Sequence, residues 1–172
     1  ACVKKSCRNT YLFGYWQSCK YFETAEEAVR KEFDFSALAK KAGLDEAALS
    51  GELNNRVCVH VRRGDYQSTQ ELRERFGFLN PRYYELAIDR MRIEVGDSFQ
   101  LAFFSDDIHW CRQQFKQVSN AIFVDPIAEK PEWFDMYRMS LCSHFILSNS
   151  TYGWWAAWLA KHAGTLVYRQ QM

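Results

Sequence analysis

The sequence has almost no net charge and no long apolar run. Its 22 Lys and Arg residues stand against 21 Asp and Glu residues, which gives a formal net charge of +1. No global field therefore favours nucleic acid or anionic lipid as a partner, and any anion site must be local. The longest apolar run, near residues 152–160, is too short to span a bilayer. We expect no nucleic-acid partner.

Linkers, repeats and low-complexity tracts are also lacking. The chain has 3 prolines in 172 residues, so no internal domain boundary is indicated. With 48% hydrophobic and 16% aromatic residues, it can fill one substantial core, and one domain is the default expectation.

The six cysteines form no Cys-x-x-Cys pair, and none stands at zinc-ligand spacing from a histidine. Cys58, Cys111 and Cys142 lie in apolar or helical surroundings and are predicted to be buried, reduced thiols. Cys2 and Cys7 could pair with each other. No zinc site is expected.

Several phosphate-binding and catalytic motifs are absent as well. The chain contains no Gly-x-x-x-x-Gly-Lys, no Gly-x-Gly-x-x-Gly and no Gly-x-Ser-x-Gly. It therefore lacks the motifs on which P-loop, dinucleotide-binding and α/β-hydrolase sites depend. There is also no Asp-x-Asp, which a metal-dependent sugar-nucleotide site normally uses. Any diphosphate site in this chain is therefore predicted to be metal-free, with arginines and helix N-termini neutralising the ligand.

What is present is an alternation of short apolar runs and amphipathic segments. Strands are predicted at 56–61, 100–104, 121–124, 144–147 and 165–168, with helices at 81–95, 108–118, 132–143 and 152–162. This alternation predicts an α/β fold with a Rossmann-like parallel sheet and helices on both faces. Gly164 is expected to follow the last helix as a C-cap residue.

The first 52 residues have a different character. The capping-box pattern Thr24-Ala25-Glu26-Glu27 predicts a helix over 25–31, and a second helix is expected over 36–41. Residues 1–22 are aromatic-rich and are interpreted as a segment covering the core. We therefore predict a helical and aromatic linking segment over 1–52 and a Rossmann-like domain over 53–172. The Trp154, Trp155 and Trp158 cluster is expected to pack in the core, in preference to stacking on sugars.

Polar residues follow the apolar runs, at the edge where open parallel sheets bind ligands. The first strand is followed by Arg62-Arg63-Gly64-Asp65, and period-two geometry puts His60 and Arg62 on the same face. An arginine at a strand tip can donate two parallel hydrogen bonds to a diphosphate, and Asp65 can orient a guanidinium. The alternative is an Arg-Asp pair that holds a turn.

Two further strand ends carry ligand-binding groups. Ser105-Asp106-Asp107 ends the second strand; one aspartate is expected to cap the next helix, which leaves the other for a base edge or ribose hydroxyls. Ser148, Asn149, Ser150 and Thr151 precede the last helix, where hydroxyls and N–H groups can form a phosphate site or a simple N-cap.

The tripeptide Arg63-Gly64-Asp65 also spells a cell-adhesion signal. Val57, Val59 and Val61 predict a buried strand directly before it, which places the tripeptide at a strand end and not on an exposed loop. An adhesion or glycan-binding module is the non-enzymatic alternative.

Three motifs in order carry a family resemblance. His60-Val61-Arg62-Arg63-Gly64-Asp65 matches the His-x-Arg-Arg-x-Asp motif of α-1,2- and α-1,6-fucosyltransferases. FFSDDIHWC at 103–111 and SNSTYGWWAAWLA at 148–160 resemble motifs of glycosyltransferase family 11, the α-1,2-fucosyltransferases, and YLFGYWQSCKYF at 11–22 resembles that family's middle region. The resemblance covers nearly the whole chain.

The resemblance implies an inverting, metal-independent transfer of L-fucose from GDP-β-L-fucose to the 2-hydroxyl of a galactose-terminated glycan. The chain would be the donor-binding half of a GT-B-like enzyme, with an α-1,6-fucosyltransferase as the alternative. Arg62 would bind the diphosphate and stabilise the departing GDP, and Arg63 would support the motif. His60 and one of Asp106 or Asp107 would contact guanine or ribose, and the run Ser148, Asn149, Ser150 and Thr151 would meet the phosphates. The general base stays open between Asp65, Glu71 and a residue outside this chain.

The chain departs from the family pattern in two places. It lacks the family's Gly-Gly-Leu-Gly-Asn-Gln segment, so we expect a fragment that is inactive when isolated. Gly153 stands where the family usually has a small polar residue. The compartment stays undecided between the cytoplasm or a peripheral membrane location, if the source is bacterial, and the Golgi lumen, if it is animal.

Overall fold

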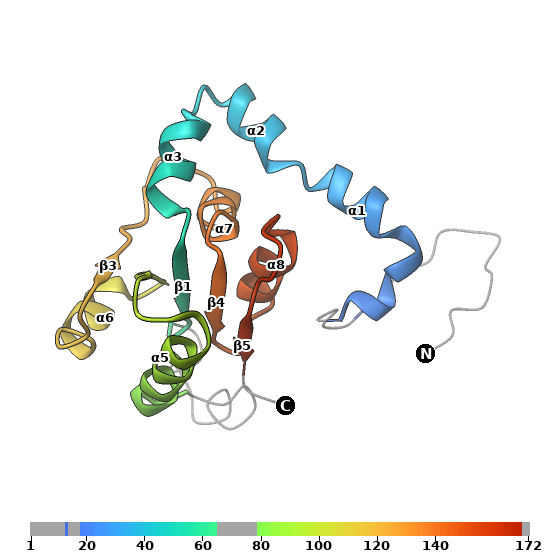
Figure 1. Ribbon diagram of the computed structural model, residues 1–172. Helices are drawn as coiled ribbons and strands as arrows, with labels where there is room; N and C mark the ends of the chain where they lie inside the picture. Colours follow the sequence, from blue (N-terminus) through green and yellow to red (C-terminus); the bar gives the residue numbers. More distant parts are fainter. Residues whose placement is uncertain (1–12, 14–17, 65–78, 170–172) are drawn as a thin grey trace.

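The core of the molecule is a five-stranded parallel sheet. The computed structural model describes residues 13, 18–64 and 79–169. The strands are β1 (Arg56–Val61), β2 (Gln100–Ser105), β3 (Ala121–Phe123), β4 (His144–Leu147) and β5 (Val167–Arg169), and they lie in the order β3-β2-β1-β4-β5 (Figure 1). All four strand pairs are parallel. The predicted Rossmann-like α/β fold is confirmed.

Helices cover both faces of this sheet. They are α5 (Pro81–Val95), α6 (Ile108–Gln114), α7 (Trp133–Ser140) and α8 (Thr151–Leu159). Side chains of α5 and α6 pack against Val57, Val59 and Val61, while α7 and α8 pack against the opposite face, which includes Cys58. The predicted alternation of β1 is confirmed, because Val57, Val59 and Val61 belong to one core cluster and Cys58 to the other.

Local sequence explains the best-defined helix. Asn80 accepts a hydrogen bond from the Tyr83 N–H at 3.2 Å, and Pro81 occupies the first helical turn of α5. The buried stripe of α5 consists of Tyr84, Ala87, Ile88 and Met91. α5 begins and ends at the residues predicted from the sequence.

Other boundaries differ from the prediction by a few residues. α6 stops at Gln114, because the backbone tightens into a turn in which the Val118 N–H donates to the Phe115 carbonyl. α8 stops at Leu159, and β5 starts two residues later than predicted. The residues before β5 form a turn instead, in which the Thr165 hydroxyl donates to the His162 carbonyl at 2.8 Å. Gly164 has a positive φ of 75°, but the predicted C-cap role is wrong, because α8 ends earlier and its C-cap residue is Ala160.

The N-terminal elements are η1 (Cys19–Tyr21), η2 (Glu23–Ala25), α1 (Glu26–Glu32), α2 (Phe35–Lys41) and α3 (Glu46–Leu53). The capping-box prediction is wrong: Thr24 lies inside η2, and no side chain caps α1. α3 was not predicted; Asp45 caps it by accepting from the Ala48 N–H at 3.0 Å. Figure 1 shows α1, α2 and α3 in a row, with α3 at the amino end of β1.

These helices share a core with the sheet's own helices. Phe35 and Ala39 of α2 pack with Phe134 and Tyr137 of α7 and with Leu159 of α8. α3 continues to Leu53, so the predicted boundary between residues 52 and 53 falls inside a helix. The division into a linking segment and a nucleotide-binding domain stays a prediction.

The tryptophans of α8 lie on its outer side. Gly153, Ala156 and Leu159 form the buried face of α8, whereas Trp154, Trp155 and Trp158 are only half-buried. Phe22 stacks on Trp155 at 5.4 Å between ring centroids and makes T-shaped contacts with Trp154 and Trp158. The prediction of core packing is confirmed for two of the three rings, because Trp155 and Trp158 pack against the core cluster that contains Phe35, Phe134 and Leu159.

The thiols behave as predicted where they are described. Cys58, Cys111 and Cys142 are buried free cysteines, while Cys2 and Cys7 lie outside the described residues. Across the described ranges, every helix is too short or too polar to cross a membrane.

Candidate functional site

The candidate site lies where the strand order reverses. β1 and β4 are neighbours at the centre of the sheet, and their next strands run outward in opposite directions. Ligands of open parallel sheets bind outside the carboxyl ends of strands at this kind of switch point. The register joins the motifs there: Val61 is level with Ser105 of β2, and the Ser148 N–H donates to the His60 carbonyl at 3.0 Å.

Asp106 organises the loop after β1. Its Oδ1 accepts from the Arg63 N–H at 2.9 Å and its Oδ2 accepts from the Gly64 N–H at 2.8 Å. The same Oδ2 lies 3.3 Å from Nη1 of Arg62. One carboxylate therefore fixes two successive backbone amides and one guanidinium.

Asp107 has a different set of partners. Its Oδ1 accepts from the Trp110 N–H at 3.1 Å, which caps α6, and its Oδ2 lies 3.2 Å from Nε of Arg63. The prediction that one aspartate caps the helix is confirmed for Asp107. Asp106 is already hydrogen-bonded to the β1 loop, and its contact with a base edge or ribose stays a prediction.

Gly64 is enclosed by this arrangement. A Cβ atom at this position would lie 2.7 Å from Oδ2 of Asp106. A larger residue would therefore push the carboxylate away from the amides that it binds.

The two adjacent arginines occupy different environments. The Arg63 guanidinium lies over the Trp110 ring, 3.6 Å from its centroid, and only 12% of the side chain is exposed. The Arg62 side chain is 37% exposed, next to Asp106 at the sheet edge. Arg63 thus stabilises the fold, and Arg62 is the arginine that a ligand can reach. Trp110 was not predicted as a partner of Arg63, because nothing in the sequence signals a contact between residues so far apart along the chain.

The environment of Arg63 also bears on the adhesion tripeptide. An adhesion loop must present its arginine to another protein, but Arg63 is held by Asp107 and Trp110. The third residue, Asp65, lies outside the described residues, as does Glu71. The catalytic roles considered for these two carboxylates stay predictions.

His60 is a buried neutral imidazole. It is 5% exposed, and its Nδ1 lies 3.0 Å from the Ser148 hydroxyl oxygen. Burial lowers the pKa of His60 to about 4, an effect that the Asp106 carboxylate opposes and Arg62 reinforces. His60 therefore offers one ring N–H and one acceptor nitrogen at neutral pH.

Gly153 owes its identity to this histidine. A Cβ atom at Gly153 would lie 2.6 Å from Nδ1 of His60. The close approach of α8 to β1 thus explains the glycine at a position where the sequence comparison with the family suggested a small polar residue.

The hydroxyl run before α8 is only partly engaged. Ser150 is the N-cap residue, but its side chain makes no cap hydrogen bond, so simple capping does not explain the run. Its amide donates to the Ser148 carbonyl at 2.8 Å. Thr151 begins α8 and is half-buried, and Asn149 lies between the two serines. Ser148 turns inward to His60, which leaves Ser150 and Thr151 nearest the helix N-terminus.

The end of β3 carries an ion pair. Asp125 binds Arg112 through both carboxylate oxygens at 2.8 and 2.7 Å, and these hydrogen bonds hold the pKa of Asp125 below its usual value. Arg138, which was not predicted, donates from Nη1 to the Asp125 carbonyl at 3.1 Å.

Tyr152, also not predicted, lies 6.0 Å from His60 between ring centroids. Within the described ranges, no group of three or more His, Cys, Asp or Glu side chains could hold a metal ion.

Comparison with known proteins matches residues 1–172 to the family described as glycosyl transferase family 11. The chain is 35% identical over 156 residues to the alpha-1,2-colitosyltransferase of Escherichia coli, covering 88% of this chain and 51% of that protein. It is 30% identical over 169 residues to the O-antigen biosynthesis glycosyltransferase WbnK of Escherichia coli, covering 95% and 55%. It is 29% identical over 164 residues to galactoside alpha-(1,2)-fucosyltransferase 1 of Lagothrix lagotricha, covering 91% and 44%. The chain spans about half the length of these curated relatives.

Proposed function

The chain belongs to glycosyl transferase family 11, and on that premise we propose that it is the donor-binding part of an α-1,2-fucosyltransferase. The proposed donor is GDP-β-L-fucose, and the proposed acceptor is the 2-hydroxyl of a galactose-terminated glycan. The observation that carries the proposal is the placement of Arg62, held by Asp106, at the switch point between β1 and β4.

In the proposed reaction, the acceptor 2-hydroxyl oxygen attacks C1 of fucose. The bond between C1 and the β-phosphate oxygen breaks, GDP leaves with the bonding electrons, and the β-linkage of the donor becomes an α-linkage. A general base takes the hydroxyl proton. Asp65 and Glu71 are the candidate bases within this chain, and a residue outside it is the alternative.

Arg62 supplies the positive charge that the departing GDP needs. Its guanidinium can donate two hydrogen bonds to a diphosphate, and the N-terminus of α8, with Ser150 and Thr151, adds N–H and hydroxyl donors. The proposed reaction therefore uses no metal ion. His60 and Asp106 are the side chains that we propose to contact guanine or ribose.

The transferred sugar has a second candidate. The relatives named above include a colitosyltransferase and a fucosyltransferase, and both names specify an α-1,2 linkage. Colitose is the second candidate sugar for this reason. Transfer by the full-length enzyme, with GDP-fucose and GDP-colitose compared as donors and the product linkage read by NMR, decides between the two sugars and between α-1,2 and α-1,6 transfer.

Calorimetry of this chain with GDP, with and without EDTA, tests the nucleotide site itself. We expect saturable binding that EDTA does not change and that Arg62→Ala weakens by at least about tenfold, since the loss of one of its two charge-assisted hydrogen bonds already has that effect. Arg82→Ala is the matched control, because Arg82 is an exposed arginine of α5 whose ion pair within the described residues is with its helical neighbour Glu85. Unchanged GDP affinity in Arg62→Ala would overturn the assignment.

A peripheral membrane location and a role in cell-surface glycan synthesis are proposals of the same kind. The E. coli relative named for O-antigen biosynthesis supports the second of these.

A further inference from the structure

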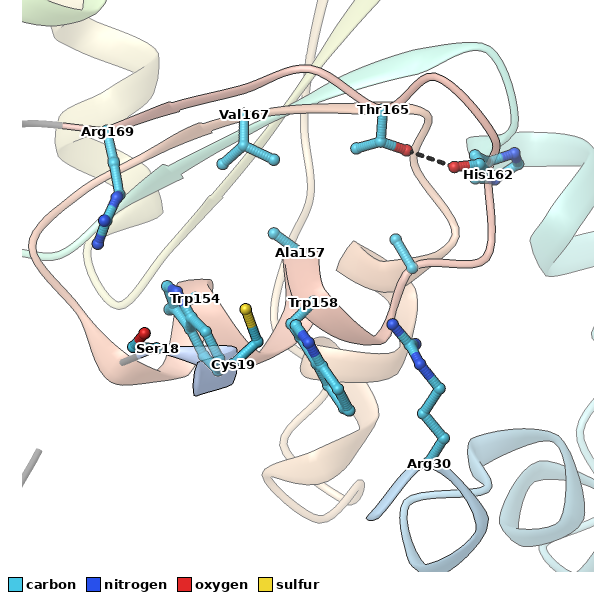
Figure 2. Close-up of a pocket in the computed structure, with 11 residues that line it drawn as sticks. Ser18, Cys19, Arg30, Trp154, Ala157, Trp158, His162, Thr165, Val167 and Arg169 are labelled. Carbon is cyan, nitrogen blue, oxygen red and sulfur yellow. Dashed lines mark hydrogen bonds between the residues drawn. The ribbon is translucent and has the colours of Figure 1, made fainter. Parts of the chain in front are cut away.

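A cavity of about 460 Å³ lies beside the candidate site, between α8, β5 and the segment that precedes α1. Figure 2 shows its lining, with the rings of Trp154 and Trp158 on one side and Val167 on the other. Its volume falls within the range of about 300–1,000 Å³ that is usual for small-molecule sites. The nucleotide proposal does not use this cavity.

Two arginines flank the cavity. Figure 2 shows Arg169 at one end and Arg30 at the other. Among the described residues that line it there is no Asp or Glu. The lining is therefore complementary to a negative charge.

The two guanidinium groups are held differently. The Arg30 guanidinium lies 4.0 Å from the centroid of the Trp158 ring, and its Nε pairs with Glu26 at 2.9 Å. Arg169 is exposed and forms no side-chain hydrogen bond or ion pair within the described residues. Arg30 is thus pre-positioned, and Arg169 has a full positive charge to offer a ligand.

The aromatic side of the cavity suits a sugar ring. Trp154 and Trp158 lie nearly parallel, with 8° between their planes and 6.4 Å between their centroids. Ala157 lies between them on α8 and adds apolar surface. The C–H face of a pyranose packs on such a surface, while its hydroxyl groups stay available to polar neighbours.

One end of the cavity adjoins the candidate site. Arg169 is level with Leu147 in the register of β4 and β5, and Leu147 directly precedes Ser148. Trp154 lies in the first turn of α8, where its backbone N–H donates to the Ser150 carbonyl at 3.1 Å. A glycan that reaches the carboxyl edge of the sheet can therefore extend into the cavity.

We propose that this cavity binds a sugar residue that carries an anionic group. The sugar ring packs on Trp154 and Trp158, and its anionic group pairs with Arg169 at one end of the cavity. The anionic group is either the carboxylate of a uronic acid or the phosphate of a sugar phosphate. As a subsite for an extended acceptor, the cavity rests on the proposed function; as a binding site for an acidic sugar, it stands alone.

The test is a titration of this chain followed by intrinsic tryptophan fluorescence and by calorimetry. The probes are methyl β-D-glucuronide, galactose 1-phosphate and uncharged methyl β-D-galactoside. We expect at least one acidic sugar to bind at least about tenfold more tightly than the uncharged one, as one charge-assisted contact supplies. The tighter of the two acidic probes identifies the source of the anionic group.

Variants locate the site. Arg169→Gln is expected to weaken binding of the acidic sugar about tenfold without weakening the uncharged one. Arg82→Gln, at an exposed arginine of α5 that does not line the cavity, is the control and should change nothing. Equal affinity for acidic and uncharged sugars, no saturable binding, or an unchanged affinity in Arg169→Gln would overturn the proposal.

A parallel GDP titration of the same samples separates the two assignments. Retained GDP binding without sugar binding refutes the cavity proposal alone. Sugar binding without GDP binding refutes the nucleotide site alone.

Discussion

Gly153→Ala tests the contact between α8 and β1, because two effects of opposite sign compete at this position. In the interior of a helix, alanine is favoured over glycine by about 1 kcal/mol. Against this, the new Cβ would lie 2.6 Å from Nδ1 of His60 and 3.2 Å from its Cγ. The sign of the change in unfolding free energy shows which effect is larger.

The clash should be the larger effect. The imidazole is buried and its Nδ1 is held by the Ser148 hydroxyl at 3.0 Å, so it cannot swing into solvent. Overpacking a tight core costs about 1–3 kcal/mol, and displacing the ring also breaks a buried hydrogen bond worth about 1 kcal/mol. We expect Gly153→Ala to destabilise the protein by about 2 kcal/mol net of the helix gain.

Urea denaturation followed by circular dichroism measures this change. Gly51→Ala is the matched control, because Gly51 lies within α3 and a Cβ atom there would meet nothing within 4 Å. The control should be neutral or more stable by up to about 1 kcal/mol.

A double-mutant cycle with His60→Ala isolates the contact. Once the imidazole is removed, Gly153→Ala should no longer destabilise the protein, and the helix gain should appear. The reasoning fails if Gly153→Ala alone is as stable as the wild type, or if its cost persists in the His60→Ala background.

Three further predictions concern the same edge of the sheet. The stability that neutral His60 provides is fully present above its unfolded pKa of 6.5 and is lost as the pH falls towards its folded pKa of about 4. The 2.5-unit difference corresponds to about 3 kcal/mol, and urea titrations across this window should show a flatter profile for His60→Gln. Asp106→Asn keeps only one acceptor oxygen for two amides and Arg62. Calorimetry should therefore show about tenfold weaker GDP binding in this variant. The control variant Asp125→Asn should bind GDP with wild-type affinity. Gly64→Ala places a methyl 2.7 Å from Oδ2 of Asp106 and should weaken GDP binding in the same direction; wild-type affinity in this variant would contradict the assigned role of the glycine.

Local sequence signals were sufficient for β1 and α5. Val57, Val59 and Val61 alternate in a run that only a buried strand accommodates, and the stripe of α5 repeats with helical spacing. A cap from one of Asp106 and Asp107 could also be predicted, and the structure assigns it to Asp107, which stands three residues before the amide that it binds. These features depend on neighbours within one turn or one strand.

Features that depend on distant neighbours could not be predicted. α3 is stabilised by the hydroxyl of Tyr137, which donates to Glu46 across 91 residues, and by the complete burial of Leu53. The role of Asp106 follows from the register of β1 and β2, which sets it against residues 42 and 43 positions earlier. The sequence placed Asp106 at the correct edge but could not show that backbone amides already bind it.

The two neighbouring arginines after β1 should differ in whether a second mutation can compensate for their substitution. They are chemically identical, yet Arg63 is enclosed by Trp110 and Asp107 whereas Arg62 faces the sheet edge. Substitutions at Arg63 should lower the amount of folded protein in a cell, and a stabilising second mutation elsewhere in the chain could compensate for them. Substitutions at Arg62 should leave the protein abundant. They would remove the proposed contact with the diphosphate, and no gain in stability elsewhere would restore it.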